Sequence, residues 1–347
     1  MIFVLLAVVA IWGTGHLLSV PTGRRWVMIW ILLAAVLLAH AILPPDNPLP
    51  RLFGGTFAGW ATLAAILIVI AGYNRGLGAL RARVKPAPQA EQGPFSDTEL
   101  DRYARHIVLR EVGGPGQKAL KDARVLVVGA GGLGSPVLLY LAAAGVGTIG
   151  VIDDDTVDNA NLQRQVIHRD QDIGTPKVFS AEAAMRAQNP NVVIRPYNRR
   201  LTPDIATEMF EDYDLILEGS DNFETRYLVN ATAAALHKPV IGAALTQWEG
   251  QISLWYPASG APCYQCVFPE APAPGLAPSC AEAGVIGPLP GVMGSMMAVE
   301  AVKHITGAGE GLGGRLLIYD ALYADTRIIR VKPRADCPVC GGARDTV

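Results

Sequence analysis

The feature that most limits how this chain can fold is a glycine-rich turn between a short apolar strand and a helix. The strand covers residues 124–128, and the sequence GAGGLGS follows it directly. Gly129, Gly131 and Gly134 have the G-x-G-x-x-G spacing, with Gly132 between them. Such a turn lets phosphate groups approach the backbone, and the free N–H groups of the next helix attract negative charge. The sequence therefore predicts a nucleotide site here.

Strands and helices alternate on both sides of this turn. Helices are expected at 134–144, 175–188 and 222–236, and short apolar strands at 148–152, 192–197, 215–217 and 240–241. This alternation predicts an α/β fold with a Rossmann-like, mostly parallel, doubly wound sheet. Later segments at 251–256, 315–319 and 327–331 have the pattern of antiparallel strands, with a helix at 293–304 between them. The sheet is expected to continue into this antiparallel part.

Three apolar runs precede the nucleotide-binding region: Ile2–Val20, Trp26–Leu43 and Phe57–Tyr73. None of them contains Asp, Glu, Lys or Arg. Each approaches the ~20 residues that a helix needs to cross a bilayer. We therefore expect three transmembrane α-helices within residues 1–74, a linker over 75–95 and one domain over 96–347.

Basic residues near these runs predict their orientation. Arg24 and Arg25 lie in the first loop, and a basic cluster follows the third run, from Arg75 to Lys85. Because cytoplasmic loops carry an excess of Lys and Arg, the N-terminus is expected outside and the catalytic domain in the cytoplasm, on the inner membrane of a bacterium. The formal net charge of −2 gives no indication of nucleic-acid binding.

Charged residues follow several of the predicted strands. Asp153 ends the second strand, where a carboxylate can accept hydrogen bonds from ribose hydroxyls. Arg164 and Lys177 place more positive charge nearby than the diphosphate of NAD requires, and they suit the charge of ATP and of departing pyrophosphate. Asp221 follows the fourth strand and could bind Mg²⁺ beside a triphosphate. An NAD-dependent oxidoreductase remains an alternative at this point.

Several longer motifs together resemble one protein family. They are RYARHIVLREVGGPGQKALKDARVLVVGAGGLGS, DDDTVDNANLQRQVIH, IGTPKV, GSDNFETR, CYQC, CAEAGVIGPLPGVMGS and CPVC. This series resembles the bacterial sulfur-carrier adenylyltransferases of the MoeB–ThiF–HesA group, in the ubiquitin-activating superfamily. The resemblance covers about residues 96–341. It implies that ATP adenylates the C-terminal Gly-Gly carboxylate of a ubiquitin-fold sulfur carrier, of the molybdopterin-synthase or thiamin type, before sulfur transfer.

The resemblance also assigns expected roles to single residues. Asp153 matches the ribose-binding acid, Arg164 and Lys177 match the phosphate-binding pair, and Asp221 matches the magnesium-binding acid. The remaining expected cofactor-binding residues are Gly129, Gly131, Gly132, Gly134, Asn161 and Asn222. Arg105, in RYAR, matches an arginine that reaches the ATP of a neighbouring subunit, which implies a homodimer.

The cysteines form two C-x-x-C pairs and one remainder. Cys263 and Cys266 with Cys337 and Cys340 can complete a tetrahedral thiolate site for Zn²⁺, and the family resemblance implies zinc at these pairs. Disulfides are the alternative, which a cytoplasmic location disfavours. Cys280 lies in a Pro/Gly-rich segment and matches a cysteine that links covalently to the carrier in some family members. An unreactive thiol is the other interpretation.

Two further interpretations remain open. A tRNA-base dehydratase of the same superfamily also activates a carboxylate with ATP, and a membrane scaffold with a residual nucleotide fold would have no activity. No sulfurtransferase domain follows Cys340, so the sulfur donor is expected to be a separate protein. His106, His168, His237 and His304 are interpreted as packed or surface histidines rather than ligands.

Overall fold

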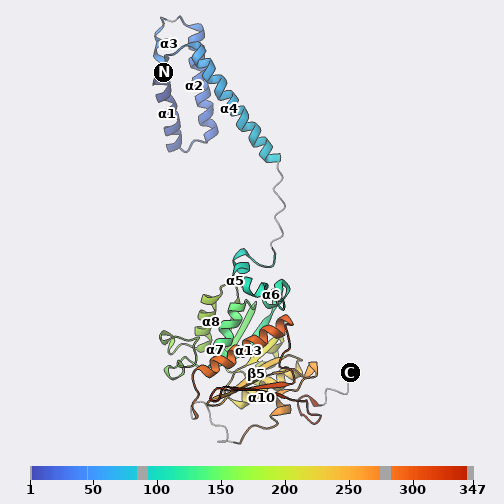
Figure 1. Cartoon of the computed structure of the whole chain (residues 1–347). Helices are drawn as coiled ribbons and strands as arrows, with labels where there is room; N and C mark the ends of the chain where they lie inside the picture. The colour runs from blue at the N-terminus through green and yellow to red at the C-terminus, as the bar shows by residue number, and fades with distance from the viewer. Residues whose placement is uncertain (1, 45, 84–92, 274–282, 342–347) are drawn as a thin grey trace. The chain divides into compact units, whose positions relative to one another are not determined.

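The computed structural model describes residues 2–44, 46–83, 93–273 and 283–341 (Figure 1). The chain divides into two compact units, Met1–Glu91 and Gln92–Val347. Each unit is described by itself.

The first unit is helical. It contains α1 (Ile2–Leu17), α2 (Thr22–Ile42), the short α3 (Pro48–Phe53) and α4 (Phe57–Arg83). A small apolar core forms where Val4, Leu33, Val36 and Trp60 meet. Most other apolar side chains of these helices are exposed, which is the surface expected of helices that contact lipid or a partner.

The prediction of three transmembrane helices is corrected by these helix lengths. Only α2 and α4 are long and apolar enough to cross a membrane among the described residues. The first apolar run forms a helix of 16 residues, shorter than the ~20 residues that a span requires. It ends before Ser19, whose φ of 53° leaves the helical region, and before Pro21. Arg24 and Arg25, predicted in a loop, lie in the first turn of α2.

Helix α4 continues without a break to Arg83, so residues 75–83 of the predicted linker are helical. Residues 84–92 lie outside the described residues. Helices α2 and α4 qualify as candidate membrane spans by length and composition alone. A buried helix in the core of a soluble protein meets the same two criteria. The helices therefore make a membrane segment one interpretation of this unit.

The second unit contains one sheet of eight strands in the described residues. Its order is β3-β2-β1-β4-β5-β6-β7-β8. The strands are β1 (Arg124–Val128), β2 (Thr148–Asp153), β3 (Val193–Asn198), β4 (Leu215–Glu218), β5 (Val240–Leu245), β6 (Glu249–Trp255), β7 (Arg315–Asp320) and β8 (Asp325–Arg330). Pairs from β3 to β5 are parallel, and pairs from β5 to β8 are antiparallel. The prediction of a parallel sheet that continues into an antiparallel part is confirmed.

The described α-helices of this unit are α5 (Asp97–Ile107), α6 (Gly113–Asp122), α7 (Gly134–Ala144), α8 (Lys177–Gln188), α9 (Pro203–Glu211), α10 (Phe223–Ala235), α11 (Tyr264–Val267) and α13 (Pro288–Thr306). The sequence pattern did not predict α5, α6, α9 and α11. The bounds of α7 agree with the prediction, because Gly145 in the left-handed conformation ends that helix.

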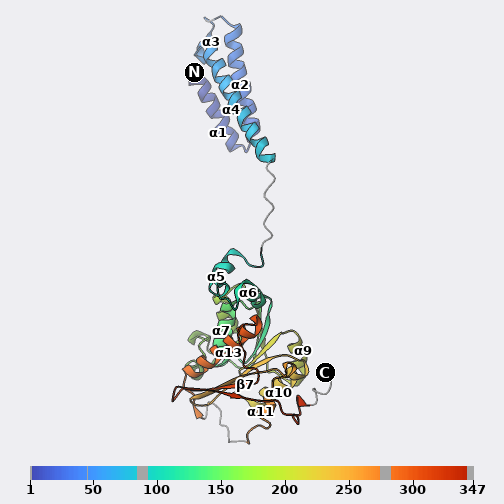
Figure 2. The ribbon, with the colours of Figure 1, turned by 45° about the vertical axis from the view of Figure 1, so that its right-hand side comes forward.

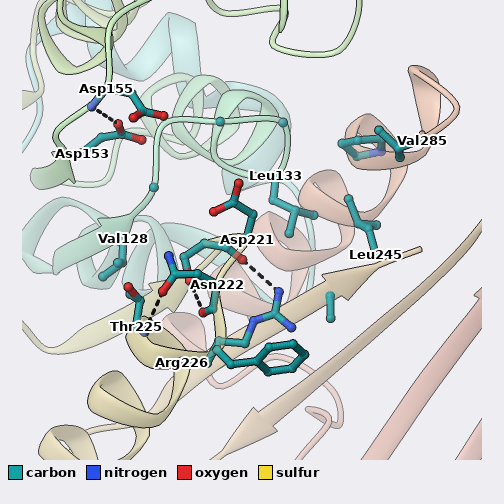
Figure 3. Close-up of a pocket in the computed structure, with 18 of the residues that line it drawn as sticks. Val128, Leu133, Asp153, Asp155, Asp221, Asn222, Thr225, Arg226, Leu245 and Val285 are labelled. Atoms are coloured by element: carbon teal, nitrogen blue, oxygen red, sulfur yellow. Dashed lines mark hydrogen bonds between the residues drawn. The ribbon is translucent and has the colours of Figure 1, made fainter. Parts of the chain in front are cut away.

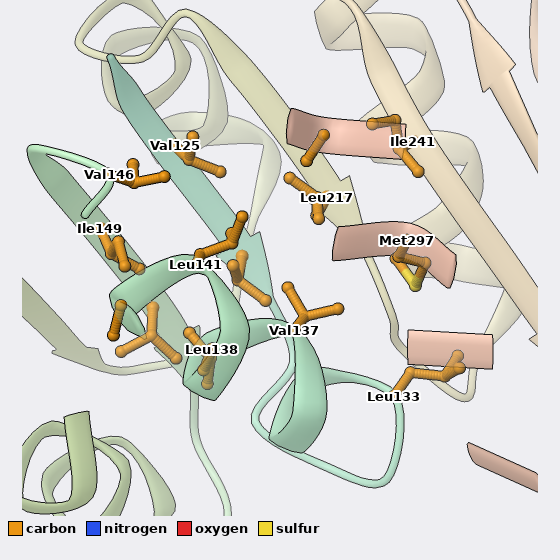
Figure 4. Close-up of a cluster of buried hydrophobic side chains, with 14 of the residues drawn as sticks. Val125, Leu133, Val137, Leu138, Leu141, Val146, Ile149, Leu217, Ile241 and Met297 are labelled. Atoms are coloured by element: carbon orange, nitrogen blue, oxygen red, sulfur yellow. The ribbon is translucent and has the colours of Figure 1, made fainter. Parts of the chain in front are cut away.

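Two apolar cores cover the two faces of the sheet. Strand β1 contributes Val125 and Val127 to one core and Leu126 and Val128 to the other, as alternation along a strand requires. The first core contains residues of α7, α8 and α13. Figure 4 shows the part of it where Val137 and Leu141 of α7 lie near Met297 of α13. The second contains residues of α9 and α10, which lie on the other side of the sheet in Figure 2. The chain thus leaves β1 toward one face and β4 toward the other.

Candidate functional site

A pocket of about 1090 Å³ opens at the carboxyl ends of β1, β2 and β4. This is the point where the strand order reverses, because β1 lies between β2 and β4. Ligands of open α/β sheets bind in the crevice at such a switch point. The walls come from the glycine-rich turn after β1, from residues 153–155 after β2 and from residues 219–222 after β4. Strands β5 and β6 extend the same pocket toward the antiparallel part.

At three positions of the glycine-rich turn, a different steric constraint favours glycine over a residue with a side chain. Gly129 has a φ of 98°, which favours glycine. A Cβ on Gly134 would lie 2.0 Å from the carbonyl oxygen of Gly129, and one on Gly132 would lie 3.0 Å from Pro290 Cβ at the start of α13. Gly129, Gly131 and Gly132 line the pocket, whereas Gly134 does not. Gly134 therefore allows close packing between α7 and β1, and its expected contact with a cofactor is not seen in the pocket wall.

Asp153 holds the glycine-rich turn in place. Its Oδ2 accepts a hydrogen bond of 2.7 Å from the N–H of Ala130, and its Oδ1 accepts one of 2.8 Å from the N–H of Asp155. Burial raises the pKa of Asp153, while the positive charge of Lys177 opposes the shift. Each carboxylate oxygen has a second lone pair. Asp153 can therefore still accept hydrogen bonds from a ligand in the pocket.

The two predicted phosphate-binding cations both line the pocket. Lys177, the first residue of α8, is only 3% exposed and pairs with Asp155 at 2.7 Å. Arg164 donates to the side-chain oxygen of Asn161 at 2.9 Å. Asn161 is absent from the pocket wall, so in this structure it orients Arg164.

The turn after β4 presents Asp221 and Asn222. Asn222 caps α10, because its Oδ1 accepts a hydrogen bond of 2.9 Å from the N–H of Thr225. Asp221 is exposed in the pocket, and its carboxylate points toward the glycine-rich turn in Figure 3. The capped helix therefore fixes the turn from which this carboxylate projects.

A buried ion pair lies below this turn and was not predicted. Glu218 accepts two hydrogen bonds from Ser220, and its Oε2 lies 3.4 Å from Nε of Arg226. Arg226 also donates to the carbonyl oxygen of Ser220 at 2.8 Å (Figure 3). Burial raises the pKa of Glu218, and the charge of Arg226 opposes that shift. The pair holds the backbone of residues 218–220 on both sides.

Other pocket residues also escaped prediction. Gln165, beside Gly131, is 5% exposed, and its Oε1 has no hydrogen-bond partner among the described residues. Arg199 and Arg200 follow β3 and extend the positive wall. Gln165 belongs to the same NLQRQ segment as Arg164, so that segment was the available signal. Nothing in the local sequence distinguishes Arg199 and Arg200 from surface residues.

Besides Gly134 and Asn161, Arg105 is a predicted site residue that the described structure does not bring to the pocket. Arg105 lies in the last turn of α5, is exposed, and is absent from the pocket wall. That position leaves its predicted contact with a second subunit as a prediction. Cys280 lies outside the described residues, and its covalent role also stays a prediction.

The four paired cysteines meet in one buried cluster. The Sγ atoms of Cys263 and Cys337 are 3.5 Å apart, and those of Cys266 and Cys340 are 3.4 Å apart. No disulfide joins them. Burial works to raise the pKa of Cys337, but hydrogen bonds from the N–H groups of Cys340 and Val339 help to outweigh it and lower the pKa to about 7. Burial raises the pKa of Cys340 to about 11 and also raises the pKa of Cys263, so Cys337 is the readiest of these three thiols to ionise.

These sulfur positions fit a metal ion. Four sulfurs at ~2.3 Å from a tetrahedral Zn²⁺ are about 3.8 Å from one another. The third close sulfur separation, between Cys263 and Cys266, is 3.8 Å. The donor set is one that could hold a metal ion such as Zn²⁺.

A model of the ThiF family matches residues 103–339, which is more than half of the chain. The chain belongs to the ThiF family. The sulfur carrier protein adenylyltransferase of Thermus thermophilus is 50% identical over 251 residues, covering 71% of this chain and 93% of that protein. The SAMP-activating enzyme E1 of Haloferax volcanii is 47% identical over 251 residues, covering 72% of this chain and 92% of that protein.

A longer relative is the probable adenylyltransferase/sulfurtransferase MoeZ of Mycobacterium tuberculosis. It is 50% identical over 247 residues, which are 70% of this chain and 63% of MoeZ. The alignment with the Thermus thermophilus adenylyltransferase covers almost all of that protein, and half of the aligned residues are identical. This chain is therefore itself an adenylyltransferase.

Solved structures agree on the fold. The structure of Escherichia coli MccB with ATP has a TM-score of 0.61 and 22% identity, covering 70% of this chain and 75% of that one. PaaA has a TM-score of 0.61 and 23% identity, covering 84% of this chain and 91% of that one. At these identities the likeness concerns the fold alone.

Proposed function

We propose that this adenylyltransferase activates the C-terminal Gly-Gly carboxylate of a ubiquitin-fold sulfur carrier protein with ATP. The observation that carries the proposal is the convergence of the glycine-rich turn, Arg164, Lys177 and Asp221 on one pocket. The relative named sulfur carrier protein adenylyltransferase, which is 50% identical over 251 residues, supplies the substrate class. The pocket extends past the turn to β5 and β6, which leaves room for an extended peptide tail.

The polar residues divide the reaction between them. The carboxylate of the carrier attacks the α-phosphorus of ATP, an acyl-adenylate forms, and pyrophosphate leaves. Lys177 and Arg164 stabilise the negative charge that develops on the phosphates. Asp153 accepts hydrogen bonds from ribose, and Asp221 would hold Mg²⁺ against the phosphate oxygens. Arg105 is proposed to act on the site of a second subunit in a homodimer.

Zn²⁺ is proposed to have a structural role. Cys263, Cys266, Cys337 and Cys340 would bind it, and all four are buried. The cluster lies outside the wall of the nucleotide pocket. A closed site of four cysteines leaves no open position for a substrate.

A membrane attachment through α2 and α4 is proposed for the first unit. With two spans, the start of α2 and the end of α4 lie on the same side of the membrane. Arg24 and Arg75 lie near these two ends, and the positive-inside preference would put both of them in the cytoplasm. This replaces the topology with three spans. The chain should resist alkaline carbonate extraction from membranes; recovery in the soluble fraction would exclude the attachment.

Pyrophosphate exchange tests the proposed activity. Purified chain, ATP, Mg²⁺ and a ubiquitin-fold carrier that ends in Gly-Gly should incorporate labelled pyrophosphate into ATP. A carrier that lacks the last glycine is the matched control and should give no exchange. If every Gly-Gly carrier of the source cell gave only the rate seen without carrier, the proposal would be wrong. The sulfur donor, proposed to be a separate protein, is not needed for this assay.

A further inference from the structure

His168 lies behind the glycine-rich turn and has both ring nitrogens engaged. It is 6% exposed. Its Nε2 is 2.9 Å from the carbonyl oxygen of Ala130, and its Nδ1 is 2.9 Å from Oγ of Ser180. Ser180 in turn donates to Oδ2 of Asp172 at 2.8 Å. The histidine therefore joins the phosphate-binding turn to α8 and to the segment before it.

The bond to Ala130 decides how the turn presents its next N–H group. In a planar trans peptide, the carbonyl of Ala130 and the N–H of Gly131 point in opposite directions. Gly131 lines the pocket, whereas His168 does not. His168 holds the Ala130 carbonyl on the buried side of the turn. The Gly131 N–H therefore points to the opposite side, toward the pocket, where a phosphate oxygen can reach it. The N–H of Ala130 is already held by Asp153.

We propose that His168 is a positioning residue for nucleotide phosphate, acting through a hydrogen bond from Nε2–H to the carbonyl oxygen of Ala130. The inference rests on the proposed function, since it assigns a role in the same nucleotide pocket. His168 itself touches no reacting atom.

Donor and acceptor counting fixes the tautomer. A carbonyl oxygen only accepts, so Nε2 must carry a proton whenever this bond exists. In the neutral ring, Nδ1 accepts the only hydroxyl proton of Ser180, so the hydrogen bond from Ser180 to Asp172 is absent in that state. In the charged ring, Nδ1 donates to Ser180, whose single hydroxyl proton then goes to Asp172. The bond to Ala130 is the same in both states. Burial lowers the pKa of His168, and the charges of Lys177, Asp153 and Asp172 near the ring also act on it. These effects decide only the state of the Ser180 branch.

Two amide substitutions distinguish the contribution of Nε2 from that of Nδ1. In His168→Gln the side-chain amide nitrogen can reach the place of Nε2, whereas in His168→Asn it can reach only the place of Nδ1. Titration calorimetry of the full-length protein with ATP and Mg²⁺ should show about tenfold weaker binding for His168→Asn, which is 1.4 kcal/mol. His168→Gln should stay within about threefold of the wild type, and so should Ser180→Ala, which keeps Nε2.

The outcomes distinguish this inference from the proposed function. Equal ATP affinity of His168→Asn and wild type, or equal losses in His168→Asn and His168→Gln, would overturn the positioning role and leave the adenylyltransferase function intact. A wild-type protein that binds no ATP would overturn both. Nitrogen NMR of histidine-labelled protein provides a readout that does not depend on the Asn variant. His168, assigned by its loss in His168→Gln, should carry the Nε2–H proton, and an Nδ1–H tautomer would contradict the inference.

Discussion

At the scale of single residues, Lys177 is a buried cation in the wall of the pocket. It is almost fully buried, and Asp155 is its ion-pair partner. A buried ammonium beside developing phosphate charge should stabilise the transition state by several kcal/mol. We expect Lys177→Ala to lower kcat/KM for pyrophosphate exchange by about 100-fold or more. Lys118→Ala, which removes an exposed pair with Asp122, is the control and should change the rate by less than about twofold. Similar rates for both variants would contradict the role of Lys177.

The pair of Glu218 and Arg226 permits a prediction about stability. Both side chains are buried, with 6% and 11% of their surface exposed. Arg226→Met leaves the Glu218 carboxylate buried without its partner, which should lower the free energy of unfolding by about 3 kcal/mol. Adding Glu218→Gln should restore part of that loss, because the uncompensated charge is gone. Urea denaturation of the two variants and the wild type measures the difference. A double variant less stable than Arg226→Met would exclude this explanation.

Which residues could be predicted depended on whether their role is visible in local sequence. Asp153, Arg164, Lys177 and Asp221 belong to motifs at strand ends, and the structure brings them to one pocket. His168 had been interpreted only as a packed or surface histidine. Its partners Ala130 and Ser180 come from different segments, so the contact depends on tertiary structure. The same holds for Glu218, whose partner lies one helix turn into α10.

At the scale of elements, α5 is held by a capping box and an ion pair. Glu99 accepts hydrogen bonds from Ser96, and Lys121 of α6 donates to Glu99 at 2.6 Å. Burial would raise the pKa of Glu99, but the bonds from Lys121 and Ser96 outweigh it and lower the pKa. This element carries Arg105, so its docking to α6 bears on the proposed site between subunits.

The pH dependence of stability should report this contact. A lowered pKa in the folded state stabilises the protein above the unfolded pKa of Glu99, and the contribution is lost as the pH falls through the folded value. We expect Glu99→Gln to destabilise the protein by about 1 kcal/mol at pH 7 and by much less near pH 3. Glu182→Gln, which affects an i,i+4 pair with Arg186, should cost less than about 0.5 kcal/mol. A loss for Glu99→Gln that is independent of pH would contradict the prediction.

The cysteine cluster joins two elements that are distant in sequence, α11 and the segment around Cys337. If Zn²⁺ binds there, its removal takes away folding free energy as well as the metal. We expect about one zinc per chain by atomic emission and a lower Tm after chelation. Cys340→Ser should lose the metal and unfold at a similarly low temperature. A metal-free chain whose Tm is unchanged by chelator would contradict a structural zinc site.

Element bounds were predictable where a local signal ends an element, and not elsewhere. Strand β1 and helix α7 agree with the prediction because the glycine-rich turn separates them and Gly145 ends the helix. Helix α5 begins at Asp97, after the N-cap residue Ser96 and its capping box, but its charged sequence lacks an apolar run. Strand β8 is exposed along its whole length, so its alternation says little about burial. α13 begins at Pro288, before the predicted start, since proline is favoured in the first turn.

At the scale of the whole molecule, the number of spans was the feature least fixed by the sequence. Composition predicted three, because all three apolar runs lack charge. Among the described residues, helix length leaves only α2 and α4 as candidate spans, since α1 ends after 16 residues. The number of membrane crossings decides on which side of the membrane the first residues lie. Counting one helix too many as a span therefore reverses the predicted side. The sheet depended less on such detail, because the order of strands and helices specifies its topology.

Whether the protein works as a dimer is a question for subunit mixing. Arg105 is exposed and outside the pocket of its own chain, so the proposed function requires it to complete the site of a partner. Arg105→Ala and Asp221→Ala should each be inactive alone. In a mixed dimer, the Arg105→Ala chain keeps Asp221 and receives Arg105 from its partner. Random pairing of equal amounts should therefore restore about a quarter of the wild-type exchange rate.

The matched control for this mixing experiment is Asp221→Ala combined with a chain that carries both substitutions. No pairing of those chains contains Asp221, so they should stay inactive. Differently tagged chains, expressed together and purified on both tags, isolate the mixed dimer. That species should have about half of the wild-type rate, because one of its two sites is intact. If the mixed dimer forms and stays inactive, Arg105 acts within its own chain. If the tags never purify together, the dimer itself is excluded.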